Sequence, residues 1–488
     1  MSHLDPTIAH LLRRAGFGLN AADADSWNRL GLAGAVTQLV DYESVPDDVD
    51  DSIGIPGYLG TISRGPFEPD YLISDTRQRW LFRLVHTQRP LQEKMALFWH
   101  NHFATGFGKI AGQIGPQAAS RALGTKPDPT NFSYLRGQLE VFRDLALGNF
   151  EHLLRTVSQD PAMVAWLDGD TNAKENPQEN YARELMELFT IGVDTFTESD
   201  VHEGARVFTG WNLRYFGFDG DDPSQQHVAF FYNPGQHDVE PKTFSFPIYS
   251  DGGRTIPSRS RTIGMQDGHD LIGALVRHPA TGPRLARKLY AFFVNEFDPP
   301  DEALVQQLSA TYYSTGFNMR EVVRELLLSD AFHDPANHWT RYSWPVELVA
   351  RMVREVGWAG FSAAEAMVPL ANMGQILFEP PDVSGWRLGT DWFSTGTVLA
   401  RMNFASSLAA NQQFNLRDAA TPQAGTPEGL LGYMVDRLEP GPYDNQVEND
   451  LRDYVNAGGA WTGSSAQVRT KAAGLAHLIG GSSEYQFV

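Results

Sequence analysis

Apolar residues recur at every third or fourth position along most of this 488-residue chain. This spacing is typical of amphipathic helices and not of strands, which alternate. Because 42% of the residues are hydrophobic, the chain can also bury a large core. The sequence therefore predicts a mostly α protein, a large multi-helix domain. The expected helices lie near 5–15, 21–42, 71–87, 90–103, 132–157, 161–167, 179–191, 198–209, 267–277, 281–296, 301–313, 319–330, 344–356, 363–376, 395–411, 426–438, 444–455 and 466–478.

One stretch departs from the helical period. At about 212–253, the runs VAFFY and TFSFPIY flank the turn-rich NPGQHDVEPK, which predicts one β-hairpin inserted between helices. Segments 44–70, 104–131 and 378–394 are rich in Gly, Pro and aromatic residues and show no helical period. We expect them to be ordered loops, and loops of that length are often functional.

The domain organisation follows from a weak seam near 413–425, with the sequence QFNLRDAATPQAG. We expect a main helical domain over 1–412 and a small helical C-terminal subdomain over 426–488. The Gly-rich stretch 457–465 predicts that this subdomain is loosely attached.

Charge and composition exclude several classes of function. The formal charge is -20, which repels phosphate backbones, so we expect no nucleic acid as a partner. The chain has no cysteine, which excludes disulfides and thiolate metal sites. No run of about 18 apolar residues occurs, so no membrane span is expected. The N-terminus of this chain does not have the pattern of a signal peptide.

A run of oxygen-bearing side chains, WLDGDTNAKENPQE, has the spacing of a calcium loop. Positions one, three, five and twelve are filled by Asp168, Asp170, Asn172 and Glu179. This predicts a site for calcium or another divalent cation, which prefers six to eight oxygen ligands. Two departures are Ala173 at position six, where Gly is usual, and Pro177. The alternative is a loop of ordinary Asx turns that caps the next helix.

The helix expected at 179–191 has an apolar face and an acidic face. Glu184 and Glu187 lie one turn apart on the acidic face, and like charges at that distance raise a carboxyl pKa, as a general acid requires. The alternative is an exposed face in which Arg183 pairs with its neighbours. The next helix begins with a capping box, Thr197 and Asp200, and carries Glu203 on its polar side.

If the polar faces of these two helices meet, Glu184, Glu187 and Glu203 converge. Three buried carboxylates need a cation, an arginine or an open cleft beside them. Further candidates are His237 and Asp238 in the expected hairpin loop. His100 and His102 point about 200° apart in a regular helix, so they bind one metal together only if the helix ends there.

Several long motifs together resemble the bacterial domain-of-unknown-function 1800 family. They are LLRRAGFG, ALFWHNHFAT, the run from LDGDTNAKENPQEN to EGARVFTGW, the HD-x-x-x-K of the hairpin, and FEPPDVSGWRLGTDWFSTGTVLARMNF, which together span about residues 5 to 410. Two departures are PQEN where the family usually has PNEN, and LFTIG, with Phe189, where it often has LHTLG. The matching positions are His100, Asn101, His102, Asp168, Asn172, Glu179, Asn180, Arg183, Glu184, Glu187, Glu203, Arg206, Trp211, His237, Asp238, Lys242, Pro380, Pro381, Gly385 and Trp386.

The resemblance implies a bacterial, often exported protein that is encoded beside a sulfatase-like or phosphatase-like partner. It implies no particular reaction, so two hypotheses stay open. The first is an acid-base or metal-assisted hydrolase acting on an extracellular substrate such as a glycan or ester, with Glu184 or Glu187 as the acid, Glu203 as the base, and His237 and Asp238 as a clamp. The second is a non-catalytic scaffold, braced by calcium, that binds a partner protein. In either case the aromatic loop Phe378–Trp386 presents rings to a ligand or braces two helices.

Overall fold

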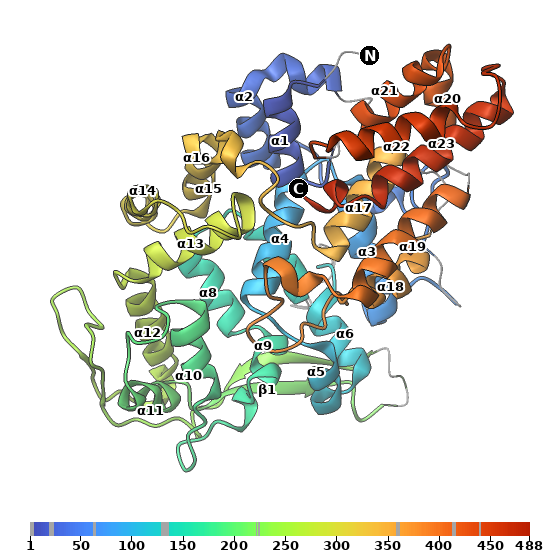
Figure 1. Ribbon diagram of the computed structural model, residues 1–488. Coiled ribbons are helices and arrows are strands. Elements are labelled where there is room, and N and C mark those ends of the chain that lie inside the picture. Colours follow the sequence, from blue (N-terminus) through green and yellow to red (C-terminus); the bar gives the residue numbers. More distant parts are fainter. Residues whose placement is uncertain are drawn as a thin grey trace.

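The computed structural model describes residues 4–18, 24–61, 65–127, 136–220, 222, 225–357, 362–411, 416–438 and 441–488. The prediction of a mostly α fold is confirmed, since helices hold 60% and strands 5% of the residues (Figure 1). Part of the expected helix 132–157 and part of the seam near 413–425 lie outside the described residues.

The N-terminal helices pack around α4, whose residues are almost all buried. Proline or a capping side chain opens several of them, as at α1, where Asp5 accepts a hydrogen bond from the Thr7 amide. The helices of this part are α1 (Pro6–Arg14), α2 (Ala24–Val40), α3 (Ile73–His86), α4 (Pro90–His102), α5 (Phe107–Ile114), α6 (Pro116–Gly124), α7 (Gln138–Asp144), α8 (Phe150–Ser158) and α9 (Pro161–Trp166).

The middle of the chain adds a second group of helices and one π-helix, η5. The expected capping box of Thr197 and Asp200 is confirmed at the start of α11. The elements are α10 (Asn180–Glu184), η5 (Leu185–Phe189), α11 (Glu198–Val207), α12 (Met265–Arg277), α13 (Thr281–Phe293), α14 (Glu302–Ser314), α15 (Met319–Leu328), α16 (Asp330–His333), α17 (Pro345–Val356), α18 (Ala363–Asn372) and α19 (Thr395–Asn411). Short 3-10 helices are η2 (Tyr42–Ser44), η3 (Val49–Ser52), η4 (Gly169–Thr171), η7 (Arg261–Ile263), η8 (Pro335–Asn337), η9 (Gly389–Trp392), η10 (Thr421–Gln423) and η11 (Glu484–Gln486).

The strands form two antiparallel ribbons, so the predicted pairing inside 212–253 is wrong. β1 (Trp211–Phe216) pairs with β2 (His227–Tyr232), and β3 (Lys242–Thr243) pairs with β4 (Thr255–Ile256). VAFFY therefore pairs with the strand before it and not with TFSFPIY. The latter run buries Phe244, Phe246 and Ile248 against the helices, and this packing replaces a ladder with VAFFY.

The prediction of a loop over 104–131 is also wrong, because most of it forms α5 and α6. Gly115 has a φ of 87°, which ends α5, and Pro116 opens α6 at once. Glycine and proline here separate two short helices, which is their usual role at helix ends. Their abundance hid the helical period in the sequence.

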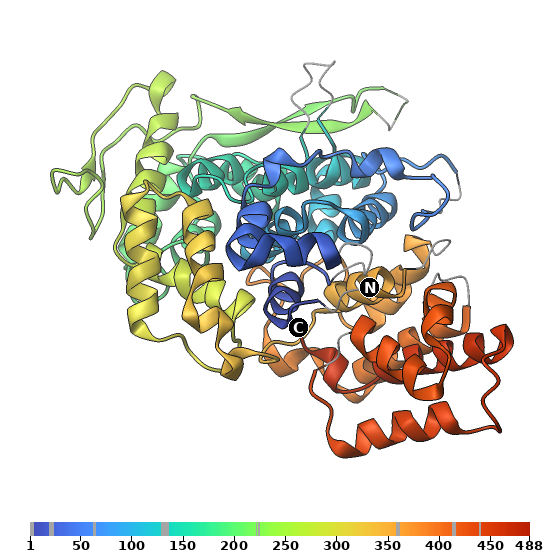
Figure 2. The same cartoon turned by 90° about the horizontal axis from the view of Figure 1, so that it is seen from above.

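The C-terminal helices α20 (Leu416–Ala420), α21 (Pro427–Leu438), α22 (Asn445–Asn456) and α23 (Ser465–Gly480) gather at the end of the molecule opposite the β1–β2 ribbon (Figures 1 and 2). The chain end is tied to the main body. The Ser343 amide donates to the Gln486 carbonyl at 2.7 Å, and the buried Tyr485 hydroxyl donates to Glu355 on α17 at 2.5 Å. These contacts attach the chain end firmly, while the division into two domains stays a prediction.

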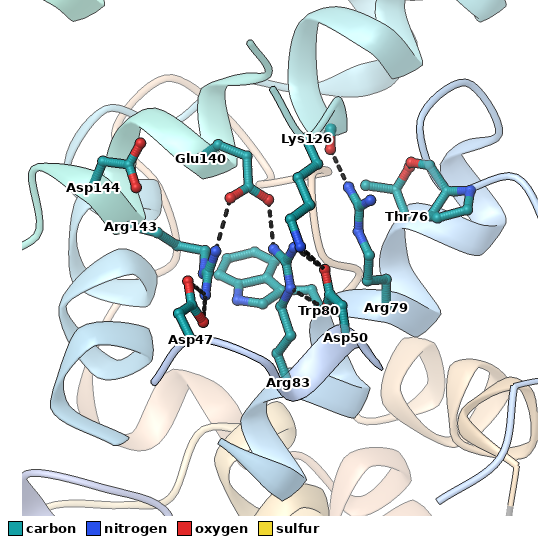
Figure 3. A network of polar contacts seen from close by, with 12 residues as sticks. Asp47, Asp50, Thr76, Arg79, Trp80, Arg83, Lys126, Glu140, Arg143 and Asp144 are labelled. Atoms are coloured by element: carbon teal, nitrogen blue, oxygen red, sulfur yellow. Dashed lines mark hydrogen bonds and ion pairs between the residues drawn. The ribbon is translucent and has the colours of Figure 1, made fainter. Parts of the chain in front are cut away.

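A buried ion network joins α3, α4 and α7 and fixes the centre of the molecule (Figure 3). The Arg83 guanidinium is fully buried and donates to Asp50 and Glu140, each at 2.6 Å. Arg143 donates to the same Glu140 and, at 2.7 Å, to Glu93. Since each charge has a partner, the network is a structural brace, and removing one member would leave a buried charge uncompensated.

Candidate functional site

The calcium-like loop lies between α9 and α10, and its oxygens are occupied by protein donors. Asp168, with φ at 59°, accepts from Lys109 and Asn180 at 3.0 Å each. Asp170 accepts from Gln113 at 2.7 Å. No group of three His, Asp or Glu side chains in the described part of the chain is placed to hold a metal ion.

The other two side chains of the motif bond elsewhere: Asn172 bonds the backbone, and Glu179 pairs with a residue of the next helix. Buried Asn172 accepts from the Gln178 amide and donates to the Ala205 carbonyl, both at 2.9 Å. Glu179 pairs with Arg183 at 3.3 Å, four residues on. The loop thus forms turns held by its own side chains, as in the alternative, although no side chain caps α10. A cation at this loop would have to displace these donors, and the calcium site stays a prediction.

Glu203, His237 and Asp238 belong to a closed network that we call the hairpin brace, made of Glu203, Arg206, His237, Asp238, Lys242 and Asp267. Arg206 donates to Glu203 at 2.7 Å and to Asp238 at 2.8 Å. Lys242 donates to Asp267 at 2.6 Å, and His237 Nε2 lies 3.3 Å from the same carboxylate. The hairpin brace ties α11 and the loop after β2 to α12.

Two acids of the hairpin brace, Asp267 and Asp238, are held in their charged form. Burial acts to raise the pKa of Asp267, but hydrogen bonds from His237 and Lys242 outweigh it, so its pKa lies below the usual value. For Asp238, burial is likewise outweighed by the hydrogen bond from Arg206, and its pKa is lowered. Paired and ionised groups of this kind stabilise a fold, because their charges are compensated by hydrogen-bonded partners within the protein.

A second cluster surrounds η5, where the expected helix 179–191 changes to π-helical geometry. We call Glu184, Glu187, His102, Arg284 and Lys288 the π-helix cluster. A π-turn leaves carbonyls without their usual partners, and such turns are frequent at functional sites. Here the Leu188 carbonyl accepts from Lys288 Nζ at 3.2 Å and from Arg284 at 3.4 Å.

Lys288 and His102 are bound to each other. Lys288 Nζ lies 3.0 Å from His102 Nδ1, while His102 Nε2 lies 3.1 Å from the Phe189 carbonyl. Burial, and then the charges of Lys288 and Arg284, lower the pKa of His102 well below its usual value. The neutral ring therefore donates from Nε2 and accepts at Nδ1.

Burial and the neighbouring Arg284 charge lower the pKa of Lys288 to about 7. Two of its three ammonium N–H groups are used, one by His102 and one by the Leu188 carbonyl. The third N–H has no partner in the described structure. An amine whose pKa lies near neutral pH and which has a free N–H is able to exchange a proton with a ligand.

The carboxylates of Glu184 and Glu187 are half-buried, and neither has a hydrogen bond or ion pair among the described residues. Burial and the charge of Glu187 raise the pKa of Glu184. Burial lowers the pKa of Arg284, and the charge of Glu187 opposes that effect, so Glu187 and Arg284 interact electrostatically. No contact joins Glu203 to either acid, so the structure brings two of the three predicted carboxylates together and directs Glu203 to the hairpin brace.

His100 and Asn101 hold the aromatic loop. His100 Nε2 accepts from the Phe378 amide at 3.2 Å, and Asn101 bonds both backbone groups of Trp386. Gly385 has a φ of 83°, and a Cβ there would clash with Asn101, so glycine is required. Trp386 is 5% exposed, which makes this loop a brace and not an open platform for sugar rings. Since α4 continues to His102, the two histidines face different partners and do not share a ligand position.

Sequence reasoning missed Arg284 and Lys288. Both lie in RLARKLYAFF on α13, four residues apart, beside the buried positions Leu285 and Leu289. Cations at the edge of an apolar helical face are a weak signal, because such side chains usually extend to water. Only the packing of α13 against η5 shows that Lys288 is partly buried and that its ammonium binds the Leu188 carbonyl.

The fold places the chain in the class of mostly helical proteins that carry short antiparallel ribbons. The chain belongs to the family described as "Protein of unknown function (DUF1800)", whose model matches residues 10–487. No curated protein and no solved structure matches the chain. In the part of the chain that the structure describes, every helix is too short or too polar to cross a bilayer.

Proposed function

We propose that the protein is an acid–base hydrolase whose reacting groups are the π-helix cluster. Two observations support this most. Glu184 and Glu187 make no hydrogen bond or ion pair among the described residues, and Glu187 interacts with the charge of Arg284. One turn further along the same helix as Arg284, Lys288 has a pKa of about 7. A half-buried acid with a raised pKa and a buried amine with a lowered pKa are both tuned towards neutral pH, as acid–base catalysts are.

The reaction needs Glu184 in its ionised form and Lys288 in its protonated form. Glu184, ionised above its raised pKa, removes a proton from water, and the oxygen of that water attacks the carbon of an ester or glycosidic bond. Lys288, protonated below about pH 7, gives its third proton to the leaving oxygen. With an ester, Arg284 stabilises the negative charge that develops on the carbonyl oxygen. With either bond, the proton on Glu184 returns to Lys288 through solvent.

The proposed mechanism predicts a bell-shaped dependence of the hydrolytic activity on pH. Activity rises as Glu184 loses its proton and falls as pH passes about 7, where Lys288 loses its proton. We propose an extracellular glycan or its ester as the substrate class. The screen that tests this uses p-nitrophenyl esters and p-nitrophenyl glycosides, because these two sets separate the bond types.

The matched variants lie on neighbouring elements. Lys288→Met and Glu184→Gln should each lower kcat/KM at least about 100-fold, the usual contribution of one acid–base group. Arg287→Gln is the control, since Arg287 is exposed on the same helix and pairs only with exposed Glu302. If the Lys288 and Glu184 variants keep full activity towards a substrate that the wild type hydrolyses, the proposal is wrong.

A second candidate is a non-catalytic scaffold that binds a partner protein, such as a sulfatase-like protein encoded nearby. The closed hairpin brace favours it, because those motif residues are paired with one another. The absence of hydrolysis in the full screen, together with stable co-elution of the purified partner, would favour the scaffold over the hydrolase.

A further inference from the structure

A cleft of about 700 Å³ lies between α6, α8, β2 and α12. None of its lining residues belongs to the π-helix cluster or to the hairpin brace. Its volume is within the range of sites for small organic ligands. The cleft is therefore a separate candidate site, and its chemistry follows from its walls.

One wall is a polar stripe of α8 and the residue after it. The stripe is formed by His152, Arg155, Thr156 and Gln159, which follow the spacing of one helical face. Leu153, Leu154 and Val157 on the other face are fully buried. The apolar face of α8 packs in the core, and its polar face lines the cleft.

Arg121 and Arg136 also line the cleft, so three arginines meet there in a protein of net charge -20. Arg155 donates to Glu151 through Nε at 3.0 Å and through Nη2 at 2.6 Å, and Nη2 also donates to the His269 carbonyl at 3.3 Å. Its Nη1 has no partner in the described structure. Arg136 bonds Asp144 through Nη2, and its Nε is buried without a hydrogen-bond partner among the described residues. N–H groups thus stay available for an anion.

Asp160 is the one acid among the lining residues, and it is 3% exposed. Its Oδ1 caps α9 by accepting from the amides of Ala162 and Met163. Burial raises the pKa of this carboxyl to about 7. Near neutral pH it therefore carries only part of a negative charge and does not cancel the arginines.

The opposite wall is apolar and is formed by Val228, Ala229 and Phe230 of β2 with Met265 of α12. We propose that this cleft binds an organic anion with an apolar body. The arginines receive a carboxylate or phosphate head group, and the β2 wall covers the aliphatic or aromatic body. This site does not depend on the hydrolase reaction.

Isothermal titration calorimetry with four probes of equal chain length tests the proposal. The probes are octanoate, octyl phosphate, octanol and octylammonium, each below its micelle concentration. We expect octanoate or octyl phosphate to bind at one site and to weaken as salt rises, and we expect the alcohol and the cation to bind at least tenfold more weakly. Equal binding of all four probes, or binding of neither anion, would overturn the proposal.

Variants locate the binding. Arg155→Gln should weaken the anion at least tenfold, and Thr156→Phe should block the cleft while it keeps every charge. Arg287→Gln, on the exposed face of α13, is the control and should bind as the wild type does. Circular dichroism checks that each variant folds. If Arg155→Gln does not fold, Thr156→Phe alone tests the location of the site. Unchanged anion binding by Thr156→Phe, whose cleft is filled, would mean that the ligand binds elsewhere and that the proposal is wrong.

Discussion

The hairpin brace and the π-helix cluster contain the same kinds of side chain, but the charges are paired in the first and incompletely paired in the second. In the hairpin brace, Asp267 and Lys242 are fully buried and every charge has a partner. In the π-helix cluster, Glu184 and Glu187 are half-buried and unpaired, and the Lys288 ammonium has one N–H to spare. Pairing stabilises the ionised form and removes reactivity, whereas incomplete pairing shifts pKa values towards neutrality.

The two regions are neighbours in the chain, and their backbones explain the difference. α11 is a regular helix with a capping box, so Glu203 and Arg206 lie one turn apart and pair directly. The helix before it changes to π-helical geometry at Leu185. That change presents the Leu188 carbonyl to α13, and the cations of α13 bind this carbonyl and not the acids nearby.

The largest expected effect comes from breaking the hairpin brace. Asp267→Ala removes the partner of Lys242 and leaves that ammonium buried, so we expect the free energy of unfolding to fall by about 3–5 kcal/mol. Urea denaturation followed by circular dichroism measures it. Glu302→Gln breaks an exposed ion pair with Arg287 and should leave the free energy of unfolding almost unchanged, because exposed pairs are screened by solvent. Equal small losses in both variants would mean that the hairpin brace does not hold α12 in place.

Replacement of Lys288 should affect stability less, and its effect should depend on pH. The folded-state pKa of Lys288 is lowered from 10.5 to about 7, so between these values the unfolded chain binds a proton that the folded chain lacks. The wild type therefore gains stability as pH rises from 7 towards 10. Lys288→Met lacks this gain, while Arg287→Gln keeps it.

Urea denaturation at pH 6, 7, 8 and 9 measures the difference in unfolding free energy between the wild type and Lys288→Met. The stability of the variant relative to the wild type should be highest at pH 6 to 7 and should decline above it. A difference that stays constant over this range would mean that Lys288 keeps an ordinary pKa. The contrast between the paired hairpin brace and the unpaired π-helix cluster would then not hold.

The sequence predicts the helices and the acidic face of 179–191 because both follow from local periodicity. The capping box of Thr197 and Asp200 was found for the same reason, since its partners are three residues apart. The pairing of β1 with β2 and the burial of Lys288 depend on contacts between distant segments. Local patterns carry no information on such contacts, so they predict the wrong partner for VAFFY and do not indicate that α13 contributes to the site.

The calcium-like loop provides the smallest expected effect and tests a motif whose spacing fits while its geometry does not. Asp168 and Asp170 already accept from Lys109 and Gln113, and a cation would have to displace both donors. We therefore expect the melting temperature to stay the same within about 1 °C in millimolar calcium and in EDTA, because a ligand that does not bind the folded state adds no stability. A clear rise with calcium that Asp170→Asn abolishes would show that the loop rearranges around the ion, and the spacing of the motif would then outweigh the hydrogen bonds that occupy it here.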